Sequence, residues 1–205
     1  MGLRERIMGL PWVYSQFQRG LARPETSSWL VNEVVRAARG QKILDVGCGP
    51  AEILADLDDV SYVGIDHNIK YIRQARSKFG ARGSFHCWDV TDPRLSQLER
   101  FDIVLVLGVL HHLTNEEVKV MLKSLSSILK GDGRLITFDC AIEVGQHPLA
   151  RLLARLDRGR YARVTNEYEQ LVSECFSITE VTVRHDLLRV PYTHAVITAT
   201  PKLVT

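Results

Sequence analysis

Cysteine is scarce in this chain, and its spacing excludes two classes of site. The four cysteines, Cys48, Cys87, Cys140 and Cys175, stand far apart among 205 residues. None belongs to a Cys-x-x-Cys pair or to a Cys/His ligand spacing, so no metal site and no dithiol redox site is expected. Isolated cysteines are typical of small buried residues in a reducing compartment. The N-terminal residues, which include Glu5, lack an apolar signal core, so we expect a cytoplasmic protein.

Long apolar runs and an excess of one charge are also missing. The longest apolar run, residues 103–110, contains a glycine and has the length of a buried strand. A membrane-spanning helix needs about 20 such residues, so no membrane span is expected. Net charge is only +2, which gives no strong field for a polyanion and argues against nucleic acid as a partner. There is no internal repeat or low-complexity linker, so residues 1–205 are expected to form one domain.

What the chain does have is an alternation of apolar runs and helical patterns. Five apolar runs are read as strands, at residues 43–46, 62–65, 84–88, 101–107 and 134–138. Helical patterns start at residues 25–28 and end at Gly40, and recur at 52–57, 68–79 and 114 to about 129. A turn is expected at 131–133. Because the strands are continuously apolar, the alternation predicts a parallel sheet covered on both faces, a Rossmann-like doubly wound α/β fold.

The pattern changes after residue 139. Helices are predicted at 148–156 and 166–175, and strands at 178–184 and 193–200. The last two strands are too close in sequence for a parallel crossover, so they must be antiparallel. The sequence therefore predicts a seven-stranded sheet, with five parallel strands followed by a C-terminal antiparallel hairpin.

A glycine turn, Gly47-Cys48-Gly49, follows the first strand. Such a turn lets a nucleotide approach the backbone and the next helix, but alone it fits a tight structural turn or a dinucleotide loop equally well. Glu52 stands where the dinucleotide fingerprint has its third glycine. Asp45 would repel a pyrophosphate, whereas it suits the cationic ammonium and sulfonium end of S-adenosylmethionine. Both details favour S-adenosylmethionine over NAD.

Acidic residues recur at the ends of the first three predicted strands. These are Asp45, Asp66 and Asp89, and ligands of open α/β sheets bind at that edge. A single aspartate at such a position is more often a turn or helix cap. Three in succession beside a glycine turn are hard to obtain by capping alone, so they indicate a ligand site.

These segments resemble the ordered motifs of class I S-adenosylmethionine-dependent methyltransferases. Residues 43–52 resemble motif I, with Ala51 where many members have glycine, and 62–68 resemble the next motif. Residues 87–90 resemble the adenine-binding motif, 101–113 the fourth-strand motif, and 129–135 the turn before strand five. The resemblance covers residues 42–139. The segments 12–14, 157–159 and 184–188 are similar to a group of small, mostly uncharacterised bacterial methyltransferases.

The resemblance implies S-adenosylmethionine as cofactor and a role for each matching residue. Asp45 and the glycine turn would hold the methionine part and Asp66 the ribose hydroxyls. Asp89 would accept from the adenine amine, and the Val90 amide would donate to the ring. His67 departs from the apolar residue common after the ribose acid. The implied cofactor-binding residues are Tyr14, Asp45, Gly47, Cys48, Gly49, Asp66, His67, Asp89, Val90 and Leu107. Tyr14 is either part of a cover over the methionine end or an ordinary packed aromatic.

The resemblance also divides the chain into functional segments. Residues 1–40 are expected to form a helical cover, and 42–139 the cofactor-binding core. Residues 140–176 form a helical lid and acceptor region, and 177–200 the terminal strand pair. His112 aligns with the histidine of a Glu-His pair in related small-molecule methyltransferases. It is either the catalytic base for an acceptor hydroxyl or a helix-entry histidine bonded to backbone.

An arginine-rich stretch lies in the acceptor region. It contains Arg151, Arg155, Arg158, Arg160 and Arg163, with a single acid among them. A solvated basic face is the commoner explanation. The alternative is a lid that recognises a carboxylate or phosphate of an anionic acceptor.

The acceptor is inferred mainly by exclusion. The Asn/Asp-Pro-Pro-Tyr/Phe motif of base amino-group methylation is missing after the fourth strand, and no Pro-Cys serves base C5 methylation. No RNA-binding motif is visible. A small-molecule, lipid or sugar-containing acceptor is therefore expected. Two alternatives stay open: a tRNA or protein methyltransferase, and a non-catalytic S-adenosylmethionine-binding module.

Overall fold

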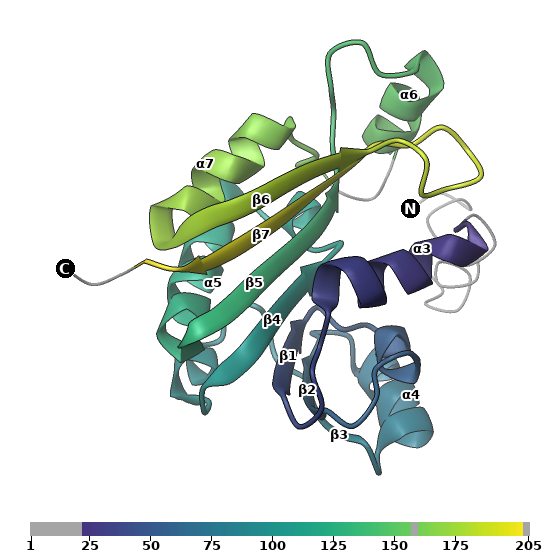
Figure 1. Cartoon of the computed structure of the whole chain (residues 1–205). Coiled ribbons are helices and arrows are strands. Elements are labelled where there is room, and N and C mark those ends of the chain that lie inside the picture. The colour runs from purple at the N-terminus through teal and green to yellow at the C-terminus, as the bar shows by residue number, and fades with distance from the viewer. Residues whose placement is uncertain (1–21, 157–159, 203–205) are drawn as a thin grey trace.

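The computed structural model describes residues 22–156 and 160–202 of the chain, built around one seven-stranded sheet (Figure 1). The strand order is β3-β2-β1-β4-β5-β7-β6. The strands are β1 (Lys42–Val46), β2 (Ser61–Ile65), β3 (Gly83–His86), β4 (Phe101–Leu107), β5 (Leu129–Cys140), β6 (Phe176–Arg184) and β7 (His194–Pro201). The first five are parallel, and β7 runs antiparallel to both β5 and β6. The predicted Rossmann-like fold with its terminal hairpin is confirmed.

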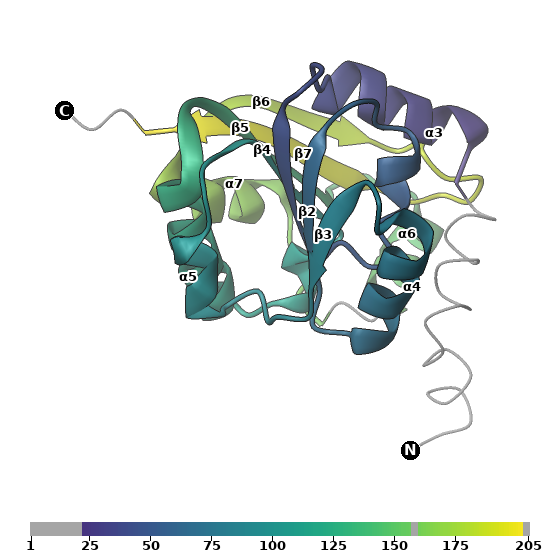
Figure 2. The same ribbon diagram turned by 90° about the horizontal axis from the view of Figure 1, so that it is seen from below.

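Helices cover both faces of the sheet (Figures 1 and 2). One face carries α3 (Pro24–Trp29), the π-helical η1 (Leu30–Val35), η2 (Glu52–Ala55) and α4 (Ile69–Phe79). The other carries η3 (Pro93–Gln97), α5 (Asn115–Ile128) and α7 (Thr165–Cys175). Alternate residues of β4 feed the two cores, with Ile103 and Leu105 on the first face and Val104 and Val106 on the second. This double burial explains why the strand is continuously apolar.

The crevice at the carboxyl edge of the sheet is set by the strand order. β1 pairs with β2 on one side and with β4 on the other, so the order reverses between β1 and β4. Ligands of doubly wound sheets bind outside the carboxyl ends of the strands at such a point. The short helix η4 (Leu110–His112) lies beyond the end of β4, and α6 (Pro148–Leu156) stands beside the β6–β7 connection (Figure 1). No helix in the described ranges is long and apolar enough to cross a membrane.

Helix starts follow the local signals in the sequence. Thr114 and Glu117 form a capping box at the start of α5, where the helical pattern was expected to begin. Asn68 caps α4 by accepting a hydrogen bond from the Lys70 amide at 3.0 Å. Each cap satisfies a backbone N–H group that has no partner inside the helix, so these boundaries are local properties of the chain.

Several predicted boundaries are wrong. The N-terminal helix ends at Arg36, with φ +43°, rather than at Gly40. The guanidinium of Arg134 donates to the carbonyls of Val34 and Val35, which stabilises that earlier end. The third strand stops at His86, two residues earlier than predicted. The expected turn at residues 131–133 lies within β5, where the register shifts opposite Phe101 and Ile103.

Candidate functional site

The two glycines of the turn after β1 have different physical reasons to be glycine. Gly47 has φ +76°, and a Cβ there would collide with the Val109 side chain. Its amide donates to the Ile65 carbonyl at 2.7 Å, which ties the turn to β2. Gly49 has φ +54°, and nothing lies within 4 Å of the place a Cβ would take. Gly47 is thus required for packing, whereas Gly49 leaves the backbone open to the approach of a ligand.

Cys48 and Ala51 lie on the buried side of this loop. Cys48 is buried, and a Cβ on Gly64 would lie 2.8 Å from its Sγ. Burial raises the pKa of the Cys48 thiol, which makes a structural role for its side chain the natural one. Ala51 is fully buried with φ +57°. This left-handed conformation favours glycine and explains the glycine that many class I methyltransferases carry here.

Asp45 is buried within β1, with an exposed fraction of 3%. The Tyr62 hydroxyl donates to its Oδ2 at 2.5 Å. Burial raises the pKa of Asp45 to about 7; the Tyr62 hydrogen bond opposes this rise, and the Asp66 charge adds to it. Asp45 is therefore not the fully charged carboxylate that its sequence position suggests. In the folded protein, a cation beside Asp45 would instead have to displace a proton from about half of the molecules at neutral pH.

Asp66 joins the glycine turn to the start of α4. It follows β2, is 6% exposed, and accepts from the Gly49 amide at 3.0 Å through Oδ2 and from the Asn68 amide at 2.7 Å through Oδ1. Asp66 therefore caps backbone amides, as the structural interpretation of such an aspartate predicts. A ribose role is compatible with it, because each carboxylate oxygen can accept a second hydrogen bond. The next residue, His67, points to solvent, with its Nδ1 3.7 Å from Asp66 Oδ1.

Asp89 lies past the end of β3 and is exposed. Its Oδ1 accepts from the Thr91 amide at 2.9 Å and from the Thr91 hydroxyl at 2.6 Å. These hydrogen bonds hold the pKa of Asp89 below its ordinary value, so it is charged at neutral pH. The side chain of Val90 belongs to the core, and Leu107, the last residue of β4, packs against the opposite core.

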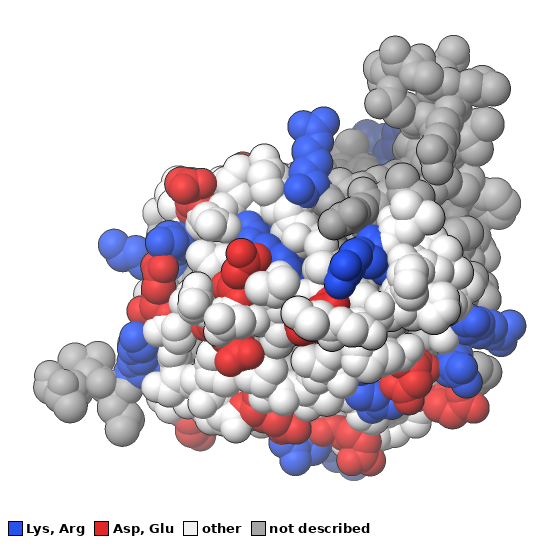
Figure 3. Space-filling model, turned by 90° about the horizontal axis from the view of Figure 1, so that it is seen from above, with Lys and Arg blue, Asp and Glu red and all other residues white. Residues whose placement is uncertain are grey.

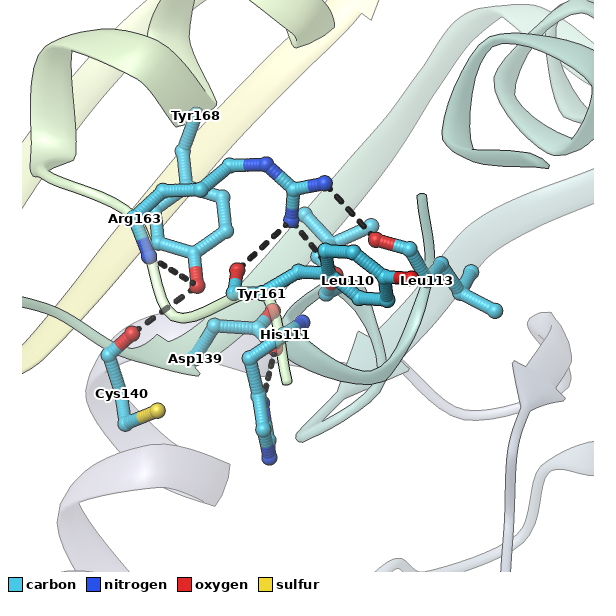
Figure 4. A network of polar contacts seen from close by, with 8 residues as sticks. All are labelled: Leu110, His111, Leu113, Asp139, Cys140, Tyr161, Arg163 and Tyr168. Carbon is cyan, nitrogen blue, oxygen red and sulfur yellow. Dashed lines mark hydrogen bonds and ion pairs between the residues drawn. The ribbon is translucent and has the colours of Figure 1, made fainter. Parts of the chain in front are cut away.

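The two histidines after β4 have opposite environments. His111 is 4% exposed, whereas His112 is exposed to solvent. The Nδ1 atom of His111 lies 2.7 Å from Asp139 Oδ1, and the same oxygen accepts the His111 amide at 3.1 Å (Figure 4). The ring centroids of His111 and His112 are 4.1 Å apart. Burial raises the pKa of Asp139, while the hydrogen bonds from His111 oppose the rise.

The His111–Asp139 pair was not expected from the sequence. The available signal was Asp139 itself, which ends the fifth predicted run just as Asp45, Asp66 and Asp89 end the first three. The pairing joins the exits of β4 and β5, so it depends on the register of two strands that sequence periodicity does not provide.

The arginine-rich stretch does not form one surface. Arg163 is buried, with an exposed fraction of 7%, and is neither a solvated residue nor part of an open lid. Arg151 and Arg160 are exposed. The side chain of Arg155 and the whole of Arg158 lie outside the described residues, as does Tyr14.

A pocket of about 380 Å³ lies between the start of α6 and the β6–β7 connection. Part of its lining comes from the segment that follows Asp139 in the chain. Its polar lining includes Glu143, Gln146, His185 and Thr193. Gln146 is 9% exposed and accepts from the Glu143 amide through Oε1. Within the described ranges, its buried Nε2 has no hydrogen-bond partner. A buried N–H donor without a partner is costly. A ligand in this pocket could supply the hydrogen-bond acceptor that Gln146 Nε2 needs.

Comparison with known proteins gives a consistent result. Residues 43–133 match a family model described as a methyltransferase domain. A TehB-like S-adenosylmethionine-dependent methyltransferase from Corynebacterium glutamicum is 20% identical with a TM-score of 0.70, covering 94% of this chain and 98% of that one. No match was found among curated proteins.

Two other similar structures contain S-adenosylhomocysteine. The N-methyltransferase NodS from Bradyrhizobium japonicum is 14% identical with a TM-score of 0.68, over 86% of both chains. The magnesium protoporphyrin IX methyltransferase from Synechocystis is 23% identical with a TM-score of 0.63, over 87% of this chain and 81% of that one. At such identities the likeness concerns the fold.

Proposed function

The chain is a class I S-adenosylmethionine-dependent methyltransferase, and from this premise we propose that it methylates a small-molecule acceptor at the carboxyl edge of β4 and β5. The observation that carries the proposal is the exposed His112, packed against a buried His111–Asp139 pair at that edge. S-adenosylmethionine supplies an activated methyl group, so the protein has to bind, orient and manage a proton.

The cofactor would lie along the glycine turn. The open space beside Gly49 supports this, since a nucleoside ligand needs backbone free of side chains. Asp45 would face the ammonium group, and Asp66 would accept from the ribose hydroxyls with its remaining lone pairs. Charged Asp89 and the Val90 amide would hold the adenine.

His112 would act as general base for a hydroxyl acceptor. Its side chain is exposed, and the turn that carries it is held from below by the hydrogen bonds of His111 to Asp139. As the acceptor oxygen takes the methyl group, the bond from that methyl to the sulfonium sulfur would break and leave S-adenosylhomocysteine, while the O–H proton would pass to the His112 ring and then to solvent. Histidine suits this role because its neutral form is abundant near pH 7.

The non-reacting part of the acceptor would occupy the pocket beside α6. Its volume lies within the range of small-ligand sites. The buried amide of Gln146 favours an acceptor with a hydrogen-bond-accepting group, such as a hydroxyl, carbonyl or carboxylate. Residues 140–176 would thus form the acceptor region and 42–139 the cofactor-binding core.

A tRNA or protein acceptor is the second candidate, and a non-catalytic cofactor-binding role is the third. On the face seen in Figure 3, Lys and Arg are interspersed with Asp and Glu rather than gathered in one basic patch. A surface of that kind gives little of the phosphate-neutralising charge that RNA binding requires. The mixed charge of this face therefore favours the small-molecule acceptor.

The test is an incubation with methyl-labelled S-adenosylmethionine and a cell extract divided into metabolite, RNA and protein fractions. The proposal predicts label in the metabolite fraction. Label confined to RNA or protein would support the second candidate. Cofactor binding by calorimetry with no labelled product in any fraction would support the third.

A further inference from the structure

Arg163 is a buried cation whose hydrogen bonds all end on neutral oxygens. A guanidinium carries five N–H donors, and hydrogen bonds run from Nε, Nη1 and Nη2 to four acceptor oxygens. Nε and Nη2 donate to Asn115 Oδ1 at 3.0 and 2.8 Å, and Nη1 also donates to the Tyr161 carbonyl at 3.0 Å. Burying a charge is costly unless its hydrogen-bonding capacity is met. A side chain used in this way has a specific structural task.

That task is visible in the two remaining acceptors. Nη1 donates to the Leu110 carbonyl at 2.7 Å, and Nη2 donates to the Leu113 carbonyl at 2.7 Å (Figure 4). These carbonyls stand on either side of His111 and His112 in the segment 110–113, the histidine turn. The Tyr161 amide also donates to the His111 carbonyl at 3.1 Å. Arg163 and Tyr161 therefore hold the backbone of the histidine turn at three carbonyl groups.

The backbone of Arg163 is itself bound to the end of β5 and to the residues that follow that strand. The Arg163 amide donates to the Tyr168 hydroxyl at 3.3 Å, and that hydroxyl donates to the Cys140 carbonyl at 3.0 Å (Figure 4). The Ile142 amide donates to the Arg163 carbonyl at 3.0 Å. Arg163 thus joins the chain after β4, which carries His111, to the end of β5, which carries Asp139.

We propose that Arg163 is a positioning residue, which fixes the histidine turn so that His112 meets the acceptor in one orientation. The catalytic part of this inference rests on the proposed role of His112. Lysine cannot replace the arginine, because an ammonium group cannot reach two carbonyls and an amide oxygen in the fixed geometry of a planar guanidinium. A displacement of about 1 Å at a catalytic group can reduce turnover by roughly a hundredfold.

The test compares Arg163→Lys and Asn115→Ala with the control Arg134→Lys. Asn115→Ala removes two of the five contacts while leaving Arg163 in place, so it is the variant more certain to fold. Arg134 also donates to backbone carbonyls, but those belong to η1 on the first face of the sheet. The rate at which diethyl pyrocarbonate modifies each histidine, read by mass spectrometry, reports the position of the turn without needing the acceptor.

In the wild type we expect buried His111 to react at least about tenfold more slowly than His112. Arg163→Lys should raise the His111 rate toward that of His112, with a smaller rise in Asn115→Ala and none in Arg134→Lys. S-adenosylhomocysteine affinity should stay within about twofold in all variants. Labelled turnover in the metabolite fraction should fall roughly ten- to hundredfold in Arg163→Lys.

Three results would overturn the inference. They are an unchanged His111 rate in both Arg163→Lys and Asn115→Ala, an equal rise in Arg134→Lys, and unchanged turnover despite an exposed His111. The proposed function fails differently: wild-type protein would not bind S-adenosylhomocysteine, or His112→Ala would keep full turnover.

Discussion

Cofactor affinity should depend on pH through Asp45, because the ammonium group of the cofactor favours the charged carboxylate. The pKa of Asp45 in the unliganded protein is about 7, raised mainly by burial. At pH 6 about a tenth of the molecules carry the charge, and at pH 8 about nine-tenths. Apparent affinity scales with the competent fraction. S-adenosylhomocysteine should therefore bind about tenfold more weakly at pH 6 than at pH 8, a difference of about 1.4 kcal/mol.

The assay is isothermal titration calorimetry in buffers of different ionisation enthalpy. Binding should release close to one proton per cofactor at pH 6 and about a tenth of a proton at pH 8. Asp45→Asn, which keeps the size of the side chain, should remove the pH dependence that arises from this residue. A wild-type affinity that is flat between pH 6 and pH 8, or an equal slope in Asp45→Asn, would refute the placement of the ammonium group beside Asp45.

The same carboxyl group links folding stability to pH. Its pKa rises from an ordinary 3.8 to about 7 on folding, so the folded state keeps a proton that the unfolded chain loses between about pH 4 and pH 7. The stabilisation that the protonated carboxyl contributes is fully present below pH 4 and is lost as pH rises through 7. Its loss lowers the free energy of unfolding by on the order of 4 kcal/mol. Denaturant unfolding of wild type and Asp45→Asn at pH 5 and pH 8 measures the difference, and wild type should lose more stability at pH 8.

Three further substitutions test the rest of the site. Asp66→Ala should weaken S-adenosylhomocysteine binding roughly ten- to hundredfold and destabilise the fold by about 1–3 kcal/mol, since two backbone amides lose their acceptor; calorimetry and urea unfolding measure the two effects, and unchanged affinity of the folded variant would leave Asp66 as a cap. Asp139→Ala should cost a similar 1–3 kcal/mol by removing the acceptor of His111 yet leave cofactor affinity unchanged, and weakened binding would place the His111–Asp139 pair at the cofactor. Gln146→Leu should reduce labelled turnover at limiting extract without changing cofactor affinity, and full turnover would exclude the pocket beside α6.

The sequence predicted most of the fold because its signals are local. Continuous apolar runs mark the parallel strands, and the capping box of Thr114 and Glu117 marks the start of α5. The short gap between the last two runs forces the antiparallel pair. The causes are burial of a strand on both faces, a backbone amide satisfied by a cap, and a connection too short for a parallel crossover. Each of these causes acts within a few residues of its signal.

The features that sequence reasoning missed depend on contacts between distant residues. The early end of η1 at Arg36 depends on Arg134, which donates to the last carbonyls of that helix from β5. Neither interpretation of the arginine-rich stretch, a solvated basic face or an anion-recognising lid, describes Arg163, because only tertiary structure shows that its donors end on the histidine turn. Asp45 was assigned a full charge because burial, which decides its pKa, is invisible in the sequence.

Methyl transfer to a small molecule, with His112 as the base, can be tested directly. The direct test is the amount of label that passes from methyl-labelled S-adenosylmethionine into the metabolite fraction, with wild type and His112→Ala side by side. We expect a labelled metabolite in the wild type, and about 10²–10⁴-fold less label in His112→Ala at equal S-adenosylhomocysteine affinity. Equal labelling by both proteins would rule out His112 as the base, and label only in RNA or protein would rule out a small-molecule acceptor.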